Sequence, residues 1–228
     1  MKELHGVQMQ ILRELLYSPG ARFSDLNISG LTSDHFTYHM TKLVELGLVE
    51  KFKKGYALTP KGKEYANKMD TDTLSIERQP KTTAIVIGMR KNGKRNELLI
   101  QTRQKEPYLG YKGFVSGKVR FGETIEATAK RELLEETGLE GKVKLKLVLH
   151  EHIHNDGNEL LEDKIFYIFT AIALKGDLHN TKEGTNEWMT REEFISDPKH
   201  FYDEKDILEW IKSDKLMFIE KNYTVEGF

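Results

Sequence analysis

Three glutamates, Glu132, Glu135 and Glu136, lie within five residues of one another in a stretch with the composition of a helix. At about 100° per residue, Glu132 and Glu136 are about 40° apart, and Glu135 is about 60° from Glu132 on the other side. The carboxylates therefore share one helical face, where their like charges repel each other. Mg²⁺ relieves such repulsion, because it prefers oxygen ligands together with the phosphates of a substrate. The pattern predicts a Mg²⁺ site, with Arg131 on the same turn to orient the cluster.

The helix that carries these glutamates is predicted over 123–139, with Gly138 as the left-handed residue at its end. We expect Ala127, Leu133 and Leu134 to lie on the opposite face and to pack on a sheet. A solvated acidic helix face is the alternative interpretation of the three glutamates.

The spacing around this helix is more specific than the glutamates alone. The pattern consists of Gly117, Glu123, Arg131-Glu132-Leu133, Glu135-Glu136 and Gly138-Leu139. The gaps between these successive parts are five, seven, one and one residues long. The pattern resembles the Nudix box, and every fixed position of the box is filled. Val115-Ser116-Gly117 stands where relatives often carry Pro-Gly-Gly, but the required glycine is kept. The resemblance extends over about residues 82–195 and implies a Nudix α/β/α sandwich with a mixed sheet.

Members of this family hydrolyse a nucleoside diphosphate linked to another moiety, with Mg²⁺ or Mn²⁺ as the cofactor. The resemblance implies four metal ligands, which are the carboxylates of Glu132, Glu135 and Glu136 and the carbonyl of Gly117. It also implies that Arg131 orients the glutamates and that Glu123 stabilises the loops around the helix. A metal site is consistent with this reaction, because phosphoryl substitution needs neutralisation of the negative charge on the phosphate.

Residues outside the box would complete the site. Relatives often take a catalytic base from a later loop, and we assign that role to Glu183. The other candidates for the base are Glu187, Glu159, Glu162 and Asp163. Each of these carboxylates has an alternative reading as an ordinary surface residue.

Substrate contacts are expected from the second predicted strand and the residues that follow it. Arg103 ends this strand, where relatives often place an arginine that contacts phosphate, and Phe114 is the candidate for stacking on a base. A surface arginine and a core aromatic are the alternatives.

His150, His152 and His154 alternate along one predicted strand and so share a face. This pattern suits a phosphate site or a metal site. It equally suits the solvated mouth of a hairpin, because Asn155-Asp156-Gly157 follows.

The first part of the chain predicts three helices, a β-hairpin with Lys53 and Lys54 at its tip, and a further helix from Pro60 through Met69. This order resembles the winged helix of small bacterial and archaeal regulators, in which the third helix enters the major groove of double-stranded DNA. The resemblance gives as candidate DNA contacts Thr37, Tyr38, Lys42, Lys53 and Lys54. The alternative is a dimerisation or docking module, since the third helix lacks the arginine that usually reads guanine.

The predicted fold class is therefore α+β and multidomain, with a winged helix-turn-helix at 1–69, a linker at 70–81 and a Nudix domain with C-terminal helices at 82–228. The formal net charge of the 228 residues is −1, which excludes a basic surface over the whole molecule. Cys is absent, which excludes disulfides and thiolate sites and disfavours the Nudix branch of isoprenoid diphosphate isomerases, which relies on a cysteine. No signal peptide or membrane span is visible, so we expect a cytoplasmic protein, and we expect a homodimer.

Two functions follow from these patterns. The first is a metal-dependent Nudix pyrophosphohydrolase with a DNA-binding winged helix. The alternative is a transcriptional regulator that uses the Nudix domain to sense a nucleotide such as ADP-ribose. A bifunctional protein, released from DNA by its substrate, lies between them.

Overall fold

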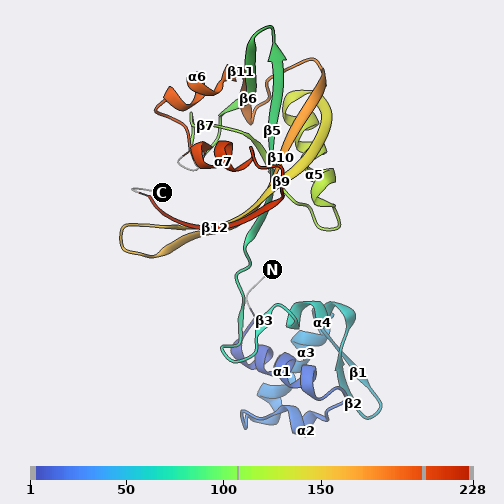
Figure 1. The fold of residues 1–228 in the computed structure, drawn as a ribbon. Helices are drawn as coiled ribbons and strands as arrows, with labels where there is room; N and C mark the ends of the chain where they lie inside the picture. Colours follow the sequence, from blue (N-terminus) through green and yellow to red (C-terminus); the bar gives the residue numbers. More distant parts are fainter. Residues whose placement is uncertain (1–3, 107, 202–203, 226–228) are drawn as a thin grey trace. The chain divides into compact units, whose positions relative to one another are not determined.

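Two units make up the chain, Met1–Arg78 and Gln79–Phe228 (Figure 1). The structure is a computed structural model, and it describes residues 4–106, 108–201 and 204–225. Within these residues, no helix is both long enough and apolar enough to cross a membrane.

The first unit has the order of elements predicted for a winged helix. Its elements are α1 (Gly6–Tyr17), α2 (Phe23–Leu26), α3 (Ser33–Glu45), β1 (Val49–Phe52), β2 (Gly55–Leu58) and α4 (Pro60–Ala66). Leu12 of α1 and Phe36 and Leu43 of α3 are buried in one core, since apolar residues recur at helical spacing. The hairpin lies close to the loop after α1, because a Cβ on Gly55 would lie 2.2 Å from the carbonyl oxygen of Gly20.

The segment after α4 differs from the prediction. The helix predicted through Met69 ends at Ala66, and Met69 instead begins the strand β3 (Met69–Asp70), which pairs with β4 (Ser75–Ile76). Asn67 caps the end of this helix, and Met69 is buried in the core of the first unit from its place on the strand. The stretch predicted as a linker at 70–81 therefore contains a small hairpin, and β5 begins at Lys81.

The second unit is built on a mixed sheet with the strand order β11-β6-β5-β10-β9-β12. The strands are β5 (Lys81–Asn92), β6 (Arg95–Arg103), β9 (Leu139–His154), β10 (Leu160–Gly176), β11 (Gly184–Thr190) and β12 (Met217–Thr224). β10 runs parallel to β5 and β12 runs parallel to β9, whereas the other neighbours are antiparallel. Two short strands, β7 (Lys112–Gly113) and β8 (Val115–Lys118), pair with β6 and β5.

Helices cover both faces of this sheet. They are α5 (Ile125–Thr137), α6 (Arg191–Ser196) and α7 (Glu204–Trp210). Successive residues of β5 point to opposite faces, so Ala84 and Val86 pack in the cluster that contains α5, and Ile85 and Ile87 pack in the cluster that contains α6 and α7. Figure 1 shows α5 on one side of the sheet and α7 on the other, which is the predicted α/β/α sandwich.

A β-bulge in β9 decides which of its residues face which layer. The pairing with β10 shifts between Ile168 and Phe169, whose partners are Leu147 and Leu145. One extra residue in a strand turns the following side chains to the other face. Leu145 therefore packs in the α5 cluster, whereas Leu147 and Leu149 pack in the α7 cluster.

Candidate active site

Helix α5 is fixed at both ends by its own sequence. The hydroxyl of Thr124 accepts a hydrogen bond from the backbone N–H of Ala127, and Gly138 ends the helix with a φ of 75°. Leu133 is buried against the sheet as predicted, but Ala127 and Leu134 are exposed, which corrects the prediction for these two residues. Turning Leu134 inward would turn the glutamates of the helix away from the molecule.

The buried face of α5 instead carries two of the three clustered glutamates. Glu132 and Glu136 are each only 8% exposed, whereas the side chain of Glu135 is half exposed. The carboxyl group of Glu132 lies where residue 117 would have a side chain, because a Cβ on Gly117 would be 1.9 Å from Cδ of Glu132. Gly117 lies in β8, so the strand and the helix meet here without an intervening side chain.

Arg131 connects the carboxylates of the box. Its Nε and Nη2 donate to the two oxygens of Glu123 at 2.7 and 2.9 Å, and its Nη1 donates to Glu132 at 2.5 Å and to Glu135 at 3.1 Å. The guanidinium holds the pKa of Glu123 at about 2, and the carboxylates raise the pKa of Arg131 in turn. The two-point pair fixes the plane of the guanidinium, which then orients the glutamates of the helix.

Glu136 has a different environment. Burial raises the pKa of Glu136 to about 7, and the nearby charges of Glu132 and Glu183 act in the same direction. The amide of Gln101 opposes this effect by donating a hydrogen bond to Oε2 at 3.0 Å. Asn186 donates to the backbone carbonyl of Glu136 at 2.7 Å and accepts a bond from Gln101 at 3.3 Å.

The glutamates open onto a cleft of about 850 Å³. Most predicted site residues line it, namely Arg103, Phe114, Gly117, Glu132, Glu135, Glu136 and Glu183. Glu183 forms an ion pair with Lys105, and this partner holds the pKa of Glu183 below its ordinary value. A carboxylate from the loop before β11 therefore faces the same space as the carboxylates of α5.

The two predicted substrate contacts are both held in place. Nε of Arg103 donates to the carbonyl of Lys105 at 3.0 Å, so the guanidinium is fixed at the rim of the cleft. Phe114 is buried, with its ring centroid 5.6 Å from that of Phe194, and it forms part of the core as well as the cleft wall.

The other carboxylates considered as a base have different positions. Glu187 pairs with Lys112 at 3.0 Å, and Glu159 is bound to Asn155 in the hairpin between β9 and β10. Glu162 lines the cleft but is engaged by Lys81 at 2.7 Å and by Lys164. Asp163, its neighbour, lies on the opposite face of β10 and contacts His150.

Sequence reasoning missed several residues of this site. Gln101 and Lys105 contact Glu136 and Glu183 directly, and Glu151 lines the cleft beside the candidate base Glu162. Gln101 lies two residues before Arg103 on the same strand, so strand alternation would have placed both on one face. The position of Glu151 depends on the bulge in β9, which leaves no comparable pattern in the sequence.

The predicted DNA contacts lie in the first unit. Thr37, Lys53 and Lys54 line a groove of about 370 Å³ beside the hairpin, together with Arg22 and Lys51. Tyr38 is exposed on α3, and Lys42 is paired with Glu45 at 2.6 Å. The groove thus gathers four basic side chains at the wing.

Comparison with known proteins agrees with this geometry. Residues 79–211, more than half of the chain, match the family model of the NUDIX domain. A solved MutT protein from Bacillus halodurans is 25% identical, with 63% of this chain and 90% of that chain covered and a TM-score of 0.53. The NUDIX domain of Shewanella oneidensis NrtR, solved in complex with ADP ribose, is 17% identical, with 68% and 97% covered and a TM-score of 0.53. A MutT protein from Methanosarcina mazei Go1 is 20% identical, with 60% and 96% covered and a TM-score of 0.50. The last two likenesses concern the fold alone.

Proposed function

The chain belongs to the NUDIX family of hydrolases, and on that premise we propose that it cleaves the diphosphate linkage of a nucleoside diphosphate derivative in a metal-dependent reaction. One observation carries this proposal, which is the meeting of Glu132, Glu135 and Glu136 with Gly117 at the cleft. A merely solvated acidic helix face would leave Glu132 and Glu136 exposed, whereas both are buried.

The donor groups at the cleft fit a hard divalent cation. Glu132, Glu135, Glu136 and the carbonyl of Gly117 supply oxygen atoms, which Mg²⁺ and Mn²⁺ prefer. Burial raises the pKa of Glu136 to about 7, so its negative charge is unfavourable in this site, and a bound cation would offset that cost. When bound, the metal would neutralise charge on the diphosphate and activate the attacking water.

The residues of the chain would position the reactants around this group. Arg131, braced by Glu123, would hold the carboxylates of Glu132 and Glu135 toward the cleft. Glu183, ionised at neutral pH beside Lys105, would accept the proton of the attacking water. Arg103 would contact the phosphates and Phe114 the base.

The test is hydrolysis of a panel of nucleoside triphosphates, nucleotide sugars, dinucleotides and ADP-ribose with Mg²⁺ or Mn²⁺. Glu136→Gln should abolish turnover, because it replaces one proposed carboxylate ligand of the metal by a neutral amide. Glu126→Gln is a matched control, because Glu126 is exposed on the same helix and pairs with Lys130 outside the cleft. Turnover that is equal in Glu136→Gln and the wild type would contradict the proposal.

The basic groove favours DNA binding as a second function of the chain. Lys51, Lys53 and Lys54 of the wing, with Arg22, would neutralise phosphates of double-stranded DNA. Replacing Lys53 and Lys54 by alanine should reduce the slope of log affinity against log salt by about 2. Replacement of Lys63, exposed on α4, should leave this slope unchanged. Binding that is independent of salt would instead favour a docking module.

The same substrate panel distinguishes a nucleotide-sensing regulator from a hydrolase. A sensor would bind one nucleotide without turning it over, which a thermal shift without product release would reveal. Dimerisation and a cytoplasmic location stay predictions, which light scattering and cell fractionation would test.

A further inference from the structure

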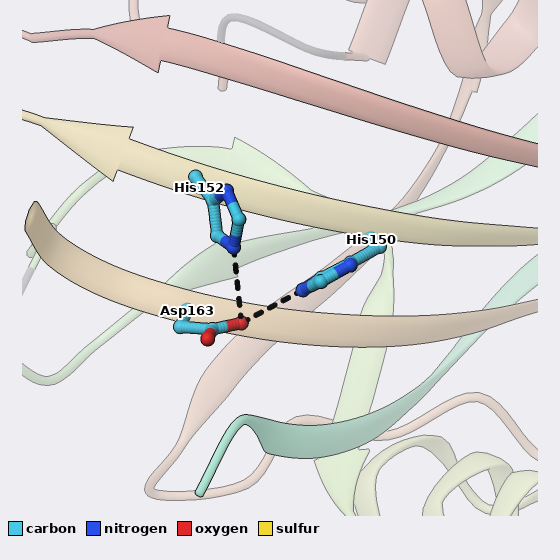
Figure 2. Close-up of side chains that lie close together, drawn as sticks. All are labelled: His150, His152 and Asp163. Carbon is cyan, nitrogen blue, oxygen red and sulfur yellow. Dashed lines mark hydrogen bonds and ion pairs between the residues drawn. The ribbon is translucent and has the colours of Figure 1, made fainter. Parts of the chain in front are cut away.

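Two histidines of β9 and an aspartate of β10 point toward one another (Figure 2). None of the three is among the residues that line the cleft. His150 and His152 alternate on β9, and Asp163 lies opposite His152 in β10. Nε2 of His150 is 2.9 Å from Oδ1 of Asp163, and Nε2 of His152 is 3.6 Å from the same oxygen. One ligand atom from each of the three side chains lies within 4.8 Å of the other two.

The neighbouring strand β12 orients both imidazole rings. Its register places Glu220 beside His150 and Asn222 beside His152. Oε1 of Glu220 is 3.3 Å from Nδ1 of His150, and Oδ1 of Asn222 is 3.3 Å from Nδ1 of His152. When Nδ1–H of a neutral ring donates to one of these oxygens, the lone pair of that ring is on Nε2, which faces Asp163 and is then available to an ion. Histidines that bind metals in proteins are commonly oriented in this way.

The distances match the spacing of ligands around a small cation. Ligands at about 2.0–2.1 Å in a tetrahedral arrangement are about 3.3 Å from one another. The observed separations of 2.9 and 3.6 Å lie on either side of that value. The side chains are 24–36% exposed, so solvent reaches the cluster and a water molecule has access to a fourth position.

We propose that His150, His152 and Asp163 bind a divalent transition-metal cation, for which Zn²⁺ is the best match. Two imidazole nitrogens and one carboxylate suit Zn²⁺ and its neighbours, whereas Mg²⁺ prefers oxygen alone. This site is distinct from the glutamates of α5 in both position and ligand type. The ion would tie β9 to β10 directly behind Glu151 and Glu162, which line the cleft on the other face of the same strands.

The test is calorimetric titration of the full-length protein with Zn²⁺ in millimolar Mg²⁺. The wild type should bind one equivalent tightly, and His150→Ala and His152→Ala should each weaken binding by more than about 100-fold. Glu220→Ala, which removes the group that orients His150, should weaken binding by about 10-fold or more. Binding should also raise the thermal midpoint of the wild type, because Zn²⁺ would stabilise the folded state alone.

Two controls locate the site. His154 lies on the same face two residues further along β9, and its ring centroid is 6.3 Å from that of His152. The variant His154→Ala should therefore bind Zn²⁺ as tightly as the wild type does. Glu136→Gln should also retain tight Zn²⁺ binding. Circular dichroism without metal checks the fold, and Asp163→Asn is the conservative substitute if an alanine variant unfolds. The proposal is overturned if the wild type takes up no Zn²⁺ in this assay, if the histidine variants bind as tightly as the wild type, or if only Glu136→Gln loses binding.

Discussion

Glu136 should destabilise the metal-free protein at neutral and alkaline pH. Burial raises the pKa of its carboxyl from the ordinary 4.5 to about 7 in the folded state. Below about pH 4.5 the carboxyl group of Glu136 is protonated in both the folded and the unfolded state, so it does not affect the free energy of unfolding. Between pH 4.5 and 7 the unfolded chain releases this proton first, so the free energy of unfolding falls as the pH rises. The full shift corresponds to about 3 kcal/mol, at 1.36 kcal/mol per pKa unit.

Replacing Glu136 by glutamine removes this loss and keeps the shape of the side chain. In EDTA at pH 8, we expect Glu136→Gln to be more stable than the wild type by about 3 kcal/mol, although it is inactive. The gain should shrink steadily as the pH is lowered to 4.5. Added Mg²⁺ should reverse the order, because the cation would stabilise the ionised glutamates of the wild type.

Urea unfolding followed by tryptophan fluorescence is the appropriate assay. The chain has two tryptophans, Trp188 and Trp210, and both lie in the second unit, so the signal reports on the unit that contains Glu136. Glu126→Gln, on the exposed side of α5, should follow the wild type at each pH. A difference between Glu136→Gln and the wild type that is below about 0.5 kcal/mol at pH 8, or that does not change with pH, would refute the reasoning.

Three further substitutions test the site in other ways. Gly117→Ala would place a Cβ 1.9 Å from Cδ of Glu132, so we expect a loss of metal-dependent hydrolysis and a destabilisation of about 1–3 kcal/mol in the same urea assay. Arg131→Lys keeps the charge but loses the two-point pair with Glu123, so the unfolding free energy should fall by about 1–3 kcal/mol, and an unchanged midpoint would contradict the bracing role. Glu183→Gln should lower kcat by about 10²–10⁴ if Glu183 is the base, and an effect confined to KM would exclude that role.

The local sequence of α5 contains most of what determines the box. The capping residue Thr124, the left-handed Gly138 and the spacing of the glutamates are all short-range features, so the helix and its acidic face were predictable. The side of the helix that is buried could not be predicted from these features. Leu134 was expected on the sheet because apolar residues usually face the core, yet the unit buries Glu132 and Glu136 instead. A functional site is where such a departure from hydrophobic patterning is expected.

Other parts of the site depend on long-range pairing. The three histidines of β9 were recognised as sharing a face, but their partner Asp163 and the orienting Glu220 come from strands 13 and 70 residues away from His150. Alternation puts Glu151 on the face opposite the histidines, and the bulge between Leu145 and Leu147 decides which of these two sets of side chains faces the cleft. Neither the strand order nor the bulge follows from alternation within one strand, so the local pattern alone did not decide between a metal site, a phosphate site and a solvated hairpin.

The distribution of positive charge in the box supports the proposed binding of a cation. Arg131 donates to Glu123, Glu132 and Glu135, and Arg120 also donates to the half-exposed Glu135 at 3.3 Å. The hydrogen bond to Oε2 of Glu136 comes from the neutral amide of Gln101. Additional arginine would stabilise the folded state, but it would also occupy the carboxylates and neutralise them before a substrate arrives. Burial raises the pKa of Glu136 to about 7, so its ionised form would gain more from a partner with two positive charges, such as a divalent cation, than from a single side chain.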